Sequence, residues 1–421
     1  MIRRSGEAIG GEIDRINADG DVSNGKKCRE SANSMTSDES PVRSTTRRHK
    51  RHKLRWVSFA LFFVVVGSVL FLRNWSPFGG TISGERLKMA LASPHYRDGE
   101  FANTLPHPPL ESADVWDYFK EQFFGDQIRV PPSDIPISAI PPSLLHAQPA
   151  PGLRVIWFGH SSVYMELDGL RLLVDPVFSD YPSPFNRTGP KRSHPPPIAL
   201  SDLPEIDAVV ISHDHYDHLD MQTVRYLSAR GTHFFVPLGV GSHLDEWDVR
   251  KNQITEMDWW ESTQIGGLTV ICTPAQHYSG RGVFDYKETL WSSWSVVGPE
   301  HRVFYSGDSG FSSHFQSIGD ELGPFDLSII KVGQYGPGAS WIYSHMDPEQ
   351  AIEAHLAVRA RRMLPVSWAT FNIAFHDWDE PIKRAVKAAN EKNAELVTPL
   401  VGSVVTAGRP FESSNWWEDV R

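Results

Sequence analysis

Cysteine is nearly absent from this 421-residue chain, which contains only Cys28 and Cys272. Two thiols are too few for a disulfide scaffold or a cysteine-rich metal site. Basic charge is also scarce, because 41 Lys and Arg residues face 51 Asp and Glu residues, for a formal charge of −10. An acidic protein repels phosphate backbones, which argues against nucleic acid as the main partner. Histidine is plentiful at 18 residues, so any metal would be held by imidazole and carboxylate.

The chain divides by composition into a polar N-terminal segment and a globular remainder. Residues 1–55 are rich in Gly, Ser, Asn and charge and lack hydrophobic periodicity, so we predict a disordered cytoplasmic tail there. Residues 73–150 are dotted with proline and contain one amphipathic stretch, 112–125, which predicts a helix within a connector. The apolar runs of one folded domain occupy residues 151–408, and a C-terminal tail covers 409–421.

An uncharged run of seventeen residues, 56–72, follows six Lys and Arg residues between positions 47 and 55. As a helix it would be about 25 Å long, which suffices for a thin or locally thinned bilayer. The basic flank favours a single-pass membrane anchor with a cytoplasmic N-terminus and an extracytoplasmic domain, periplasmic in a Gram-negative bacterium. Two alternatives stay open: a buried core helix, and a signal peptide if translation starts downstream, for instance at Met35.

Short β-rich runs separated by turns begin at residue 153. The expected strands are 153–159, 163–169, 170–176, 206–212, 233–237, 268–274, 293–298, 302–308 and 327–333, and the expected helices are 219–230, 347–360 and 380–393. Most of these strands follow one another with few helices between them. The pattern predicts an α/β fold of two sheets with helices outside, a four-layer αββα sandwich.

The sequence Ser-His-Asp-His-Tyr-Asp-His fills positions 212–218, between an expected strand and an expected helix. Clustered imidazoles and carboxylates are costly to bring together unless an ion compensates them. His213 and His215, two residues apart, can point the same way from an extended loop and bind one ion. Asp217 and His218 can reach a second ion a few ångströms away. The segment therefore predicts a metal-binding loop rather than a solvated polar loop.

Three polar residues at the ends of other apolar runs can complete such a site: His277, Asp308 and His376. We predict that His277 joins His213 and His215, that His376 joins Asp217 and His218, and that Asp308 bridges the two ions. Taken singly, each of these three added residues could equally well be structural. The ligand set contains only nitrogen and oxygen, which suits two catalytic Zn²⁺ ions and leaves Fe and Mn as alternatives.

The order and spacing of these motifs resemble the metallo-β-lactamase fold, and within it the N-acyl-phosphatidylethanolamine phospholipase D group and its bacterial relatives. The resemblance covers residues 150–385 and is carried by the segments Trp157–Ser162, Asp175–Phe178, Gly189–Arg192, Ile211–Leu219, Phe235–Gly239, Asp258–Glu261, Thr273–His277, Trp291–Val296, Gly307–Gly310, Gly323–Leu327, His345–Pro348 and Asp377–Pro381. Two segments depart from the family pattern. Ser367 stands where a His usually precedes a Trp-Gly-Thr-Phe element, and Gln334–Trp341 replaces an Ala-Tyr-Glu-Pro-Arg-Trp segment.

The resemblance implies a binuclear zinc hydrolase of the phospholipase D type that acts on N-acyl-phosphatidylethanolamine or related membrane lipids. Two such ions would share a bridging water and lower its pKa, generating a hydroxide nucleophile. We predict two catalytic residues, Asp308 to hold the ions together and Asp217 to orient that water. The same device could instead hydrolyse a soluble ester, lactone or amide, and a third hypothesis is a non-catalytic binding protein. The expected partners are lipid and the bilayer, with a homodimer left open.

Three further residues are weaker candidates for roles near the metals. Asp175, in a turn before proline, could hydrogen-bond a ligand His from behind or could simply stabilise that turn. His160 ends the strand expected at 153–159, where a role beside the metals and a structural role are equally expected. His345 precedes the helix expected at 347–360 and is either an exposed residue or a substrate contact.

Overall fold

The computed structural model describes residues 45–73, 75–106, 112–149, 151–185, 187–336, 338–411 and 413–421. Most of the predicted tail, residues 1–44, lies outside them, and so does Met35. The chain forms two compact units, 1–65 and 66–421. All the strands found among the described residues belong to the second unit.

The first helix, α1 (Thr45–Arg73), contains the apolar run at 56–72. No helix in the described part of the chain has the length and apolarity needed to cross a membrane. Seventeen residues rise only about 25 Å as a helix, short of the ~30 Å hydrocarbon core of a typical bilayer. This finding contradicts the predicted single-pass anchor and, with it, the extracytoplasmic placement of the folded domain that rested on that anchor.

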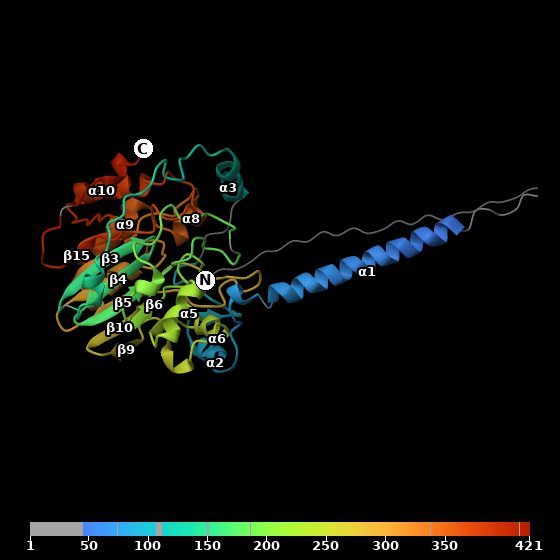
Figure 1. Ribbon diagram of the computed structural model, residues 1–421, viewed down its shortest axis with the longest axis horizontal. Helices are drawn as coiled ribbons and strands as arrows, with labels where there is room; N and C mark the ends of the chain where they lie inside the picture. The colour runs from blue at the N-terminus through green and yellow to red at the C-terminus, as the bar shows by residue number, and fades with distance from the viewer. Residues whose placement is uncertain are drawn as a thin grey trace, which may run out of the picture. The chain divides into compact units, whose positions relative to one another are not determined.

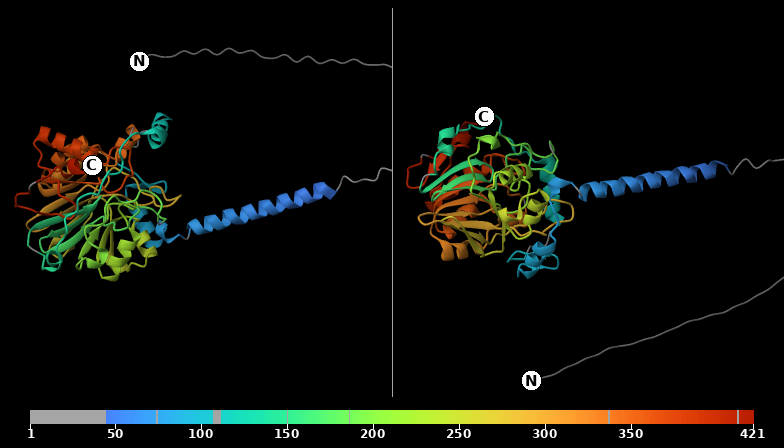
Figure 2. Two further views of the ribbon diagram at one scale, coloured as in Figure 1. Left: turned by 45° about the horizontal axis from the view of Figure 1, so that its top comes forward. Right: turned by 60° about the horizontal axis from the view of Figure 1, so that its bottom comes forward.

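Two sheets form the centre of the second unit and lie against each other, mainly green and mainly yellow to orange in Figure 2. Among the described residues, the first sheet has the strand order β15 (Val404–Thr406), β3 (Leu153–Gly159), β4 (Ser162–Leu167), β5 (Leu170–Val174), β6 (Ala208–Val210), β7 (His233–Pro237) and β8 (Ile254–Met257). The second has the order β14 (Ala360–Val366), β13 (Phe325–Lys331), β12 (Arg302–Tyr305), β11 (Ser293–Val297), β10 (Leu268–Thr273) and β9 (Ser262–Ile265).

Each sheet combines an antiparallel half with a parallel half. In the first sheet, β15 to β5 pair antiparallel and β5 to β8 pair parallel. In the second sheet, β9 to β12 pair antiparallel and β12 to β14 pair parallel. The connections into the parallel strands cross over from one end of a sheet to the other, and they include the loops that contain residues 212–218 and Asp308.

The two faces of the first sheet contribute to two different hydrophobic cores. Val155 of β3 belongs to the same buried cluster as Val270 of β10, so this face packs on the second sheet. The next residue, Ile156, belongs to a second cluster with Leu227 of α5 (Met221–Ala229). Successive side chains of a strand point to opposite faces, and here both faces are covered. Residues 155–158 of this strand are continuously apolar for this reason.

Helices complete the four layers that the sequence predicts. The helices α5 and α6 (Gly241–Glu246) cover the first sheet, whereas α7 (His314–Leu322), α9 (Pro348–Ala357) and α10 (Glu380–Lys392) lie with the second. In Figure 1, α5 and α6 lie on the opposite side from α9 and α10. Ile382, Ala385 and Ala389 of α10 are buried at the spacing of one helix face. A capping box of Asp347 and Gln350 defines the beginning of α9.

The remaining elements surround this sandwich: η1 (Ser76–Phe78), α2 (Gly84–Ala92), β1 (Tyr96–Arg97), β2 (Glu100–Phe101), α3 (Ser112–Phe124), α4 (Pro142–His146), η2 (Leu200–Asp202), η3 (Lys251–Gln253), α8 (Ala339–Ser344) and η4 (Trp416–Asp419). The helix expected at 112–125 is α3. In the segment predicted as a C-terminal tail, Trp416 and Trp417 are buried against Trp368. That segment therefore takes part in the core.

Candidate metal centre

The polar segment 211–220 joins β6 to α5 at one end of the first sheet. Because β6 runs parallel to its two neighbours, its carboxyl end opens into a loop rather than a hairpin. Asp220 caps α5 by accepting a hydrogen bond from the Gln222 backbone N–H, and this fixes where the helix begins. His213 and His218 are both buried. A buried loop of this composition needs polar partners or an ion.

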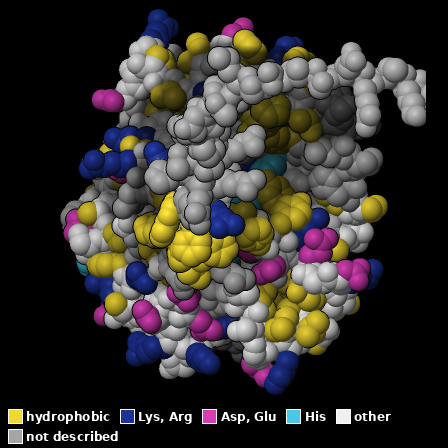
Figure 3. All heavy atoms as spheres, turned by 90° about the vertical axis from the view of Figure 1, so that its right-hand side faces the viewer, with side chains coloured by type: hydrophobic (Ala, Val, Ile, Leu, Met, Phe, Trp, Pro, Cys, Tyr) yellow, Lys and Arg dark blue, Asp and Glu magenta, His cyan; other side chains and the backbone are white. Residues whose placement is uncertain are grey.

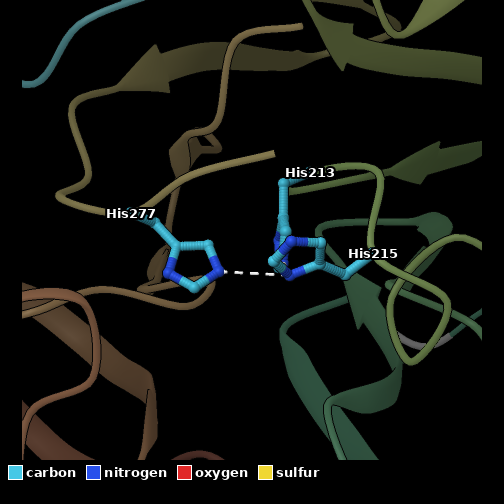
Figure 4. Close-up of side chains that lie close together, drawn as sticks. All are labelled: His213, His215 and His277. Carbon is cyan, nitrogen blue, oxygen red and sulfur yellow. Dashed lines mark hydrogen bonds between the residues drawn. The ribbon is translucent and has the colours of Figure 1, made fainter. Parts of the chain in front are cut away.

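Three imidazoles converge to form what we call the first group: His213, His215 and His277 (Figure 4). His213 and His215 come from the loop after β6, and His277 comes from the loop after β10. The His215 Nδ1 atom lies 2.9 Å from His213 Nε2 and 3.3 Å from His277 Nε2. Nitrogens that are bound at about 2.0–2.1 Å to one tetrahedral zinc ion are about 3.3 Å apart. The spacing therefore fits one divalent ion.

Hydrogen bonds on the far side of two of these rings decide which nitrogen faces the centre. His277 Nδ1 donates to the Ser344 carbonyl oxygen at 3.1 Å. The Ser212 hydroxyl donates to Asp175 and so accepts from His213 Nδ1 at 2.9 Å. In both rings the proton is on Nδ1, and the Nε2 lone pair is directed at the centre. A partner of this kind behind the ring is usual for metal-binding histidines.

The first group is uncharged. Burial lowers the pKa of His213 and His277 well below the ordinary value, and neighbouring imidazoles lower it further. Burial also lowers the pKa of His215, although nearby carboxylates oppose the shift. Neutral imidazole is the form that binds metal. Burial therefore keeps all three imidazoles in the neutral form that their predicted role as ligands requires.

A second group lies beside the first and consists of His160, Asp217 and His218. The Asp217 Oδ2 atom lies 2.9 Å from His160 Nε2 and 3.3 Å from His218 Nε2. His218 Nδ1 donates to Asp175 at 2.6 Å, so its Nε2 atom faces the centre. Within the described residues, neither His218 Nε2 nor Asp308 Oδ1, 3.4 Å away, has a hydrogen-bond partner, although both atoms are buried. Such unpaired atoms fit a cation between them.

Asp308 follows β12 and lies between the two groups. Its Oδ1 atom faces His218, whereas its Oδ2 atom lies 3.4 Å from His345 Nδ1. His277, Asp308 and His345 can also bring ligand atoms together, so the carboxylate adjoins the first group. Burial raises the pKa of Asp308, but Lys331 and the imidazoles lower it more, and the net pKa is below the ordinary value. Asp308 is therefore ionised and lies where the sequence predicts a bridging ligand.

Lys331 is a charged residue of the centre that the sequence motifs do not include. It is the last residue of β13 and is fully buried, with Nζ 3.4 Å from Asp308 Oδ2. Nζ also donates to His345 Nδ1. Burial lowers the pKa of Lys331, and Asp308 opposes the shift. A lysine at the end of an otherwise apolar strand is the signal by which the sequence could have identified it, because lysine is rarely buried without an ionised partner.

His376 does not join Asp217 and His218 as predicted. Its Nδ1 atom donates to the Asp377 carbonyl oxygen at 2.8 Å, and its Nε2 atom accepts from the Gln334 backbone N–H at 3.0 Å. One nitrogen thus carries a proton and the lone pair of the other accepts a hydrogen bond, so both nitrogens are engaged within the protein. His376 belongs to none of the potential metal-binding groups found among the described residues. The structure therefore does not bring His376 together with Asp217 and His218 as predicted.

The weaker candidates Asp175 and His345 also border the centre. Asp175 is fully buried and accepts hydrogen bonds from His218 Nδ1, the Ser212 backbone N–H and the Tyr305 hydroxyl. It therefore holds His218 in one orientation. His345 lies against the first group, with its ring 4.8 Å from that of His277. Its position is not that of an exposed residue before a helix.

Apolar side chains from the loop after His277 border one side of the centre. The Tyr278 ring lies 4.8 Å from the His215 ring, and Tyr286 packs against Tyr278. The tip of this loop exposes Val283 and Phe284, the latter to 83%. Figure 3 shows histidine at the bottom of a hollow with hydrophobic side chains around it.

Apolar side chains of α3 border a second side. Trp341 of α8 lies 6.0 Å from the His345 ring, and Tyr118 of α3 stacks on Trp341. The same helix exposes Trp116 to 70% and Phe124 to 83%. The approach to the metal centre therefore has an apolar rim made from two segments far apart in the sequence.

Comparison with known proteins agrees with this geometry. Residues 170–368 match the β-lactamase superfamily domain. An uncharacterized protein of Mycobacterium tuberculosis is 43% identical over 331 residues, 77% of this chain and 87% of that protein. The N-acyl-phosphatidylethanolamine-hydrolyzing phospholipase D 1 of Caenorhabditis elegans is 35% identical over 66% of this chain and 81% of its own. A metal-dependent hydrolase of Pyrobaculum neutrophilum is 26% identical over 59% of this chain and 97% of its own length. The chain thus belongs to the metallo-β-lactamase superfamily, as a metal-dependent hydrolase whose relatives include an N-acyl-phosphatidylethanolamine-hydrolyzing phospholipase D.

Proposed function

We propose that this protein is a phospholipase D-type phosphodiesterase that hydrolyses N-acyl-phosphatidylethanolamine or a related lipid with two zinc ions. The observation that carries the proposal is the apolar rim around the metal centre. A phosphodiester can reach the bottom of the hollow while its acyl chains remain against apolar side chains such as Phe284 and Trp341. The nematode relative, which is named for this reaction, supports the same substrate class.

Six residues would hold the ions in this proposal. His213, His215 and His277 would bind one ion, whereas Asp217, His218 and Asp308 would bind the other, with Asp308 shared between them. Nitrogen and oxygen donors without sulfur suit catalytic zinc. Two such ions supply Lewis-acid stabilisation of the phosphoryl oxygens and lower the pKa of water towards neutrality.

Asp217 would orient the attacking water. Burial raises its pKa, but the neighbouring imidazoles of His218 and His160 lower it more, so the net pKa is well below the ordinary value and the carboxylate is ionised. An ionised carboxylate can accept a hydrogen bond from water and direct its oxygen at phosphorus. The new bond joins that oxygen to phosphorus, and the bond from phosphorus to the ethanolamine oxygen breaks. The products are phosphatidic acid and, after protonation of the leaving oxygen, an N-acylethanolamine.

A lipid surface is the partner that this proposal implies. Phe284, Phe124 and Trp116 are exposed to 83%, 83% and 70%, and they belong to the two segments that form the rim. Exposed aromatic side chains on segments beside a metal centre are often sites of contact with another apolar body. Lipid packed in a vesicle would cover them and present its headgroup to the centre at the same time.

The test is to incubate the zinc-loaded full chain with vesicles that contain N-acyl-phosphatidylethanolamine and to identify both products by mass spectrometry. We expect phosphatidic acid and N-acylethanolamine in equal amounts, and neither with His213→Ala. Soluble esters, lactones and β-lactams form a parallel panel with the same enzyme. Rapid turnover of one of those compounds without phosphatidic acid would reject the lipid substrate and retain the hydrolase.

A further inference from the structure

The imidazole that was predicted to complete the second group, His376, forms hydrogen bonds elsewhere. His376 has a proton on one nitrogen and an acceptor role on the other. We propose that His160 is a ligand of the second metal ion in this chain. The inference rests on the metal centre of the proposed function but is independent of its substrate.

Three hydrogen bonds hold the backbone of His160 in place and thereby fix the position of its ring. The His160 N–H donates to the Thr370 hydroxyl at 2.6 Å, and its carbonyl oxygen accepts from Trp157 Nε1 at 2.8 Å and from the Ser367 N–H at 3.0 Å. Its φ angle is 48°, in the left-handed region that costs a non-glycine residue free energy. Strain of this kind persists only where the surroundings enforce it, and it is common at functional sites.

The atoms around this ring form a complete donor set. His160 Nε2 lies 2.9 Å from Asp217 Oδ2, which lies 3.3 Å from His218 Nε2, which in turn lies 3.4 Å from Asp308 Oδ1. The set contains two imidazole nitrogens and two carboxylate oxygens, a normal composition for zinc. His160 is 1% exposed, so no bulk water competes for its lone pair. Two of the four atoms have no hydrogen-bond partner among the described residues.

Ser367 lies beside His160 and cannot supply an imidazole to the second group. Its short side chain ends in a hydroxyl 2.7 Å from the Ser161 hydroxyl. The Ser367 backbone N–H meets the His160 carbonyl oxygen, so the two residues are adjacent. A serine that is held by its neighbour offers no imidazole, and the His160 ring is the nearby group that does.

A purely structural role for His160 makes a different prediction. In that case Nε2 carries a proton and donates to Asp217, and a glutamine amide could make the same hydrogen bond. Glutamine is a poor zinc ligand, whereas aspartate is a good one. His160→Gln therefore keeps the hydrogen bond and removes the ligand, and His160→Asp restores a ligand.

The experiment counts zinc per chain by mass spectrometry after dialysis and measures both affinities by calorimetric titration of the metal-free full chain. We expect two ions in the wild type, with His160→Gln losing at least about 100-fold in affinity for the second ion and leaving the first unchanged. His160→Asp should recover part of the loss. The matched control His376→Gln should bind both ions normally.

Wild-type binding of both ions by His160→Gln would overturn the inference. So would loss of an ion from His376→Gln, or a wild type that binds only one. Equal thermal unfolding of the metal-free proteins shows that the variants are folded; if His160→Gln is not, the same titration on His160→Asn replaces it. None of these readouts uses a lipid, so failure of the proposed substrate would leave them intact.

Discussion

The two halves of the metal centre are adjacent but differ in charge and in construction. The first group contains three imidazoles that burial keeps neutral. In the second group, burial lowers the pKa of His218, but Asp217 and Asp308 raise it more, so that its net pKa is well above the ordinary value. The first group draws on two loops, whereas the second combines the residue after β3 with the loop after β6 and adjoins Asp308 of the loop after β12.

The difference indicates how each half tolerates the absence of an ion. Without an ion, the main free-energy cost in the first group comes from buried nitrogen lone pairs that have no partner, because its imidazoles carry no charge. In the second group, carboxylates and a protonated imidazole can pair with one another, and Lys331 balances Asp308. We therefore expect the first group to depend on metal for its hydrogen bonding and the second to depend on its own charge balance.

The largest expected effect is loss of activity when the first group is broken. His213→Ala removes one of the three imidazoles of the first group, the one whose Nδ1 donates to Ser212 and whose Nε2 faces the centre. Because metal ions supply several kcal/mol of transition-state stabilisation, hydrolysis should fall by about 1,000-fold. Initial rates at saturating zinc measure this. His376→Ala is the control and should stay within a few-fold of the wild type; equal losses in both variants would contradict the comparison.

Removal of the Lys331 ammonium group beside Asp308 should lower the stability mainly of the metal-free protein. Lys331→Met leaves a buried carboxylate without its partner, which costs about 3 kcal/mol of unfolding free energy. Zinc can replace the missing positive charge, so the loss should shrink when the metal is bound. Denaturant unfolding with and without zinc measures both values. An equal loss in the two states would show that Lys331 serves packing rather than charge balance.

Substitution of Asp175 should lower the affinity for one metal ion more than for the other. Asp175→Asn weakens the 2.6 Å hydrogen bond that orients His218. Affinity for the second ion should fall about 10- to 100-fold, with a smaller change for the first. Calorimetric titration of the metal-free protein resolves the two steps. A larger loss at the first ion would mean that Asp175 acts through Ser212 and His213 instead.

The smallest effect should be on how the unfolding free energy of the metal-free protein depends on pH, with opposite signs for the two groups. Burial lowers the pKa of His277, so unfolding takes up a proton below about pH 6.5, and stability falls on acidification. The carboxylates raise the pKa of His218 above the unfolded value, so its contribution is present at pH 6.5 and is lost as the pH rises through the folded value. His277→Asn should flatten the stability curve between pH 7 and 5.

The matched variant His218→Asn should flatten the same curve on the alkaline side instead. Unfolding free energies across the pH range, measured with a chelator present, decide between these outcomes. If both variants alter the same side of the curve, the two groups do not differ in charge as described.

Much of the centre could be predicted because its signals are local. Residues 212–218 are contiguous, and a strand before them and a helix after them are visible from periodicity alone. His277 and Asp308 each follow an apolar strand, and the ends of adjacent strands meet in space. Asp175 and His345 show weaker signals, because a turn residue and a residue before a helix look alike whether or not they face a metal.

Other features depend on contacts that leave no local trace. His376 and His160 each follow an apolar run and look alike in the sequence. The structure distinguishes them, because His376 accepts a hydrogen bond from the Gln334 N–H and donates one to the Asp377 carbonyl oxygen. The run at 56–72 looked sufficient for an anchor because its length is close to the limit, and the structure contradicts that prediction.

By itself, the order of amino acids determined the αββα layering and the core of the metal-binding loop, because both follow from periodicity and from residues close together in the chain. The tertiary structure alone decided which distant side chains complete the second group and that a buried lysine balances its charge. The physical reason is that the nearest groups in space decide what a lone pair or a charge interacts with. For His160, His376 and Lys331, those groups come from remote parts of the chain.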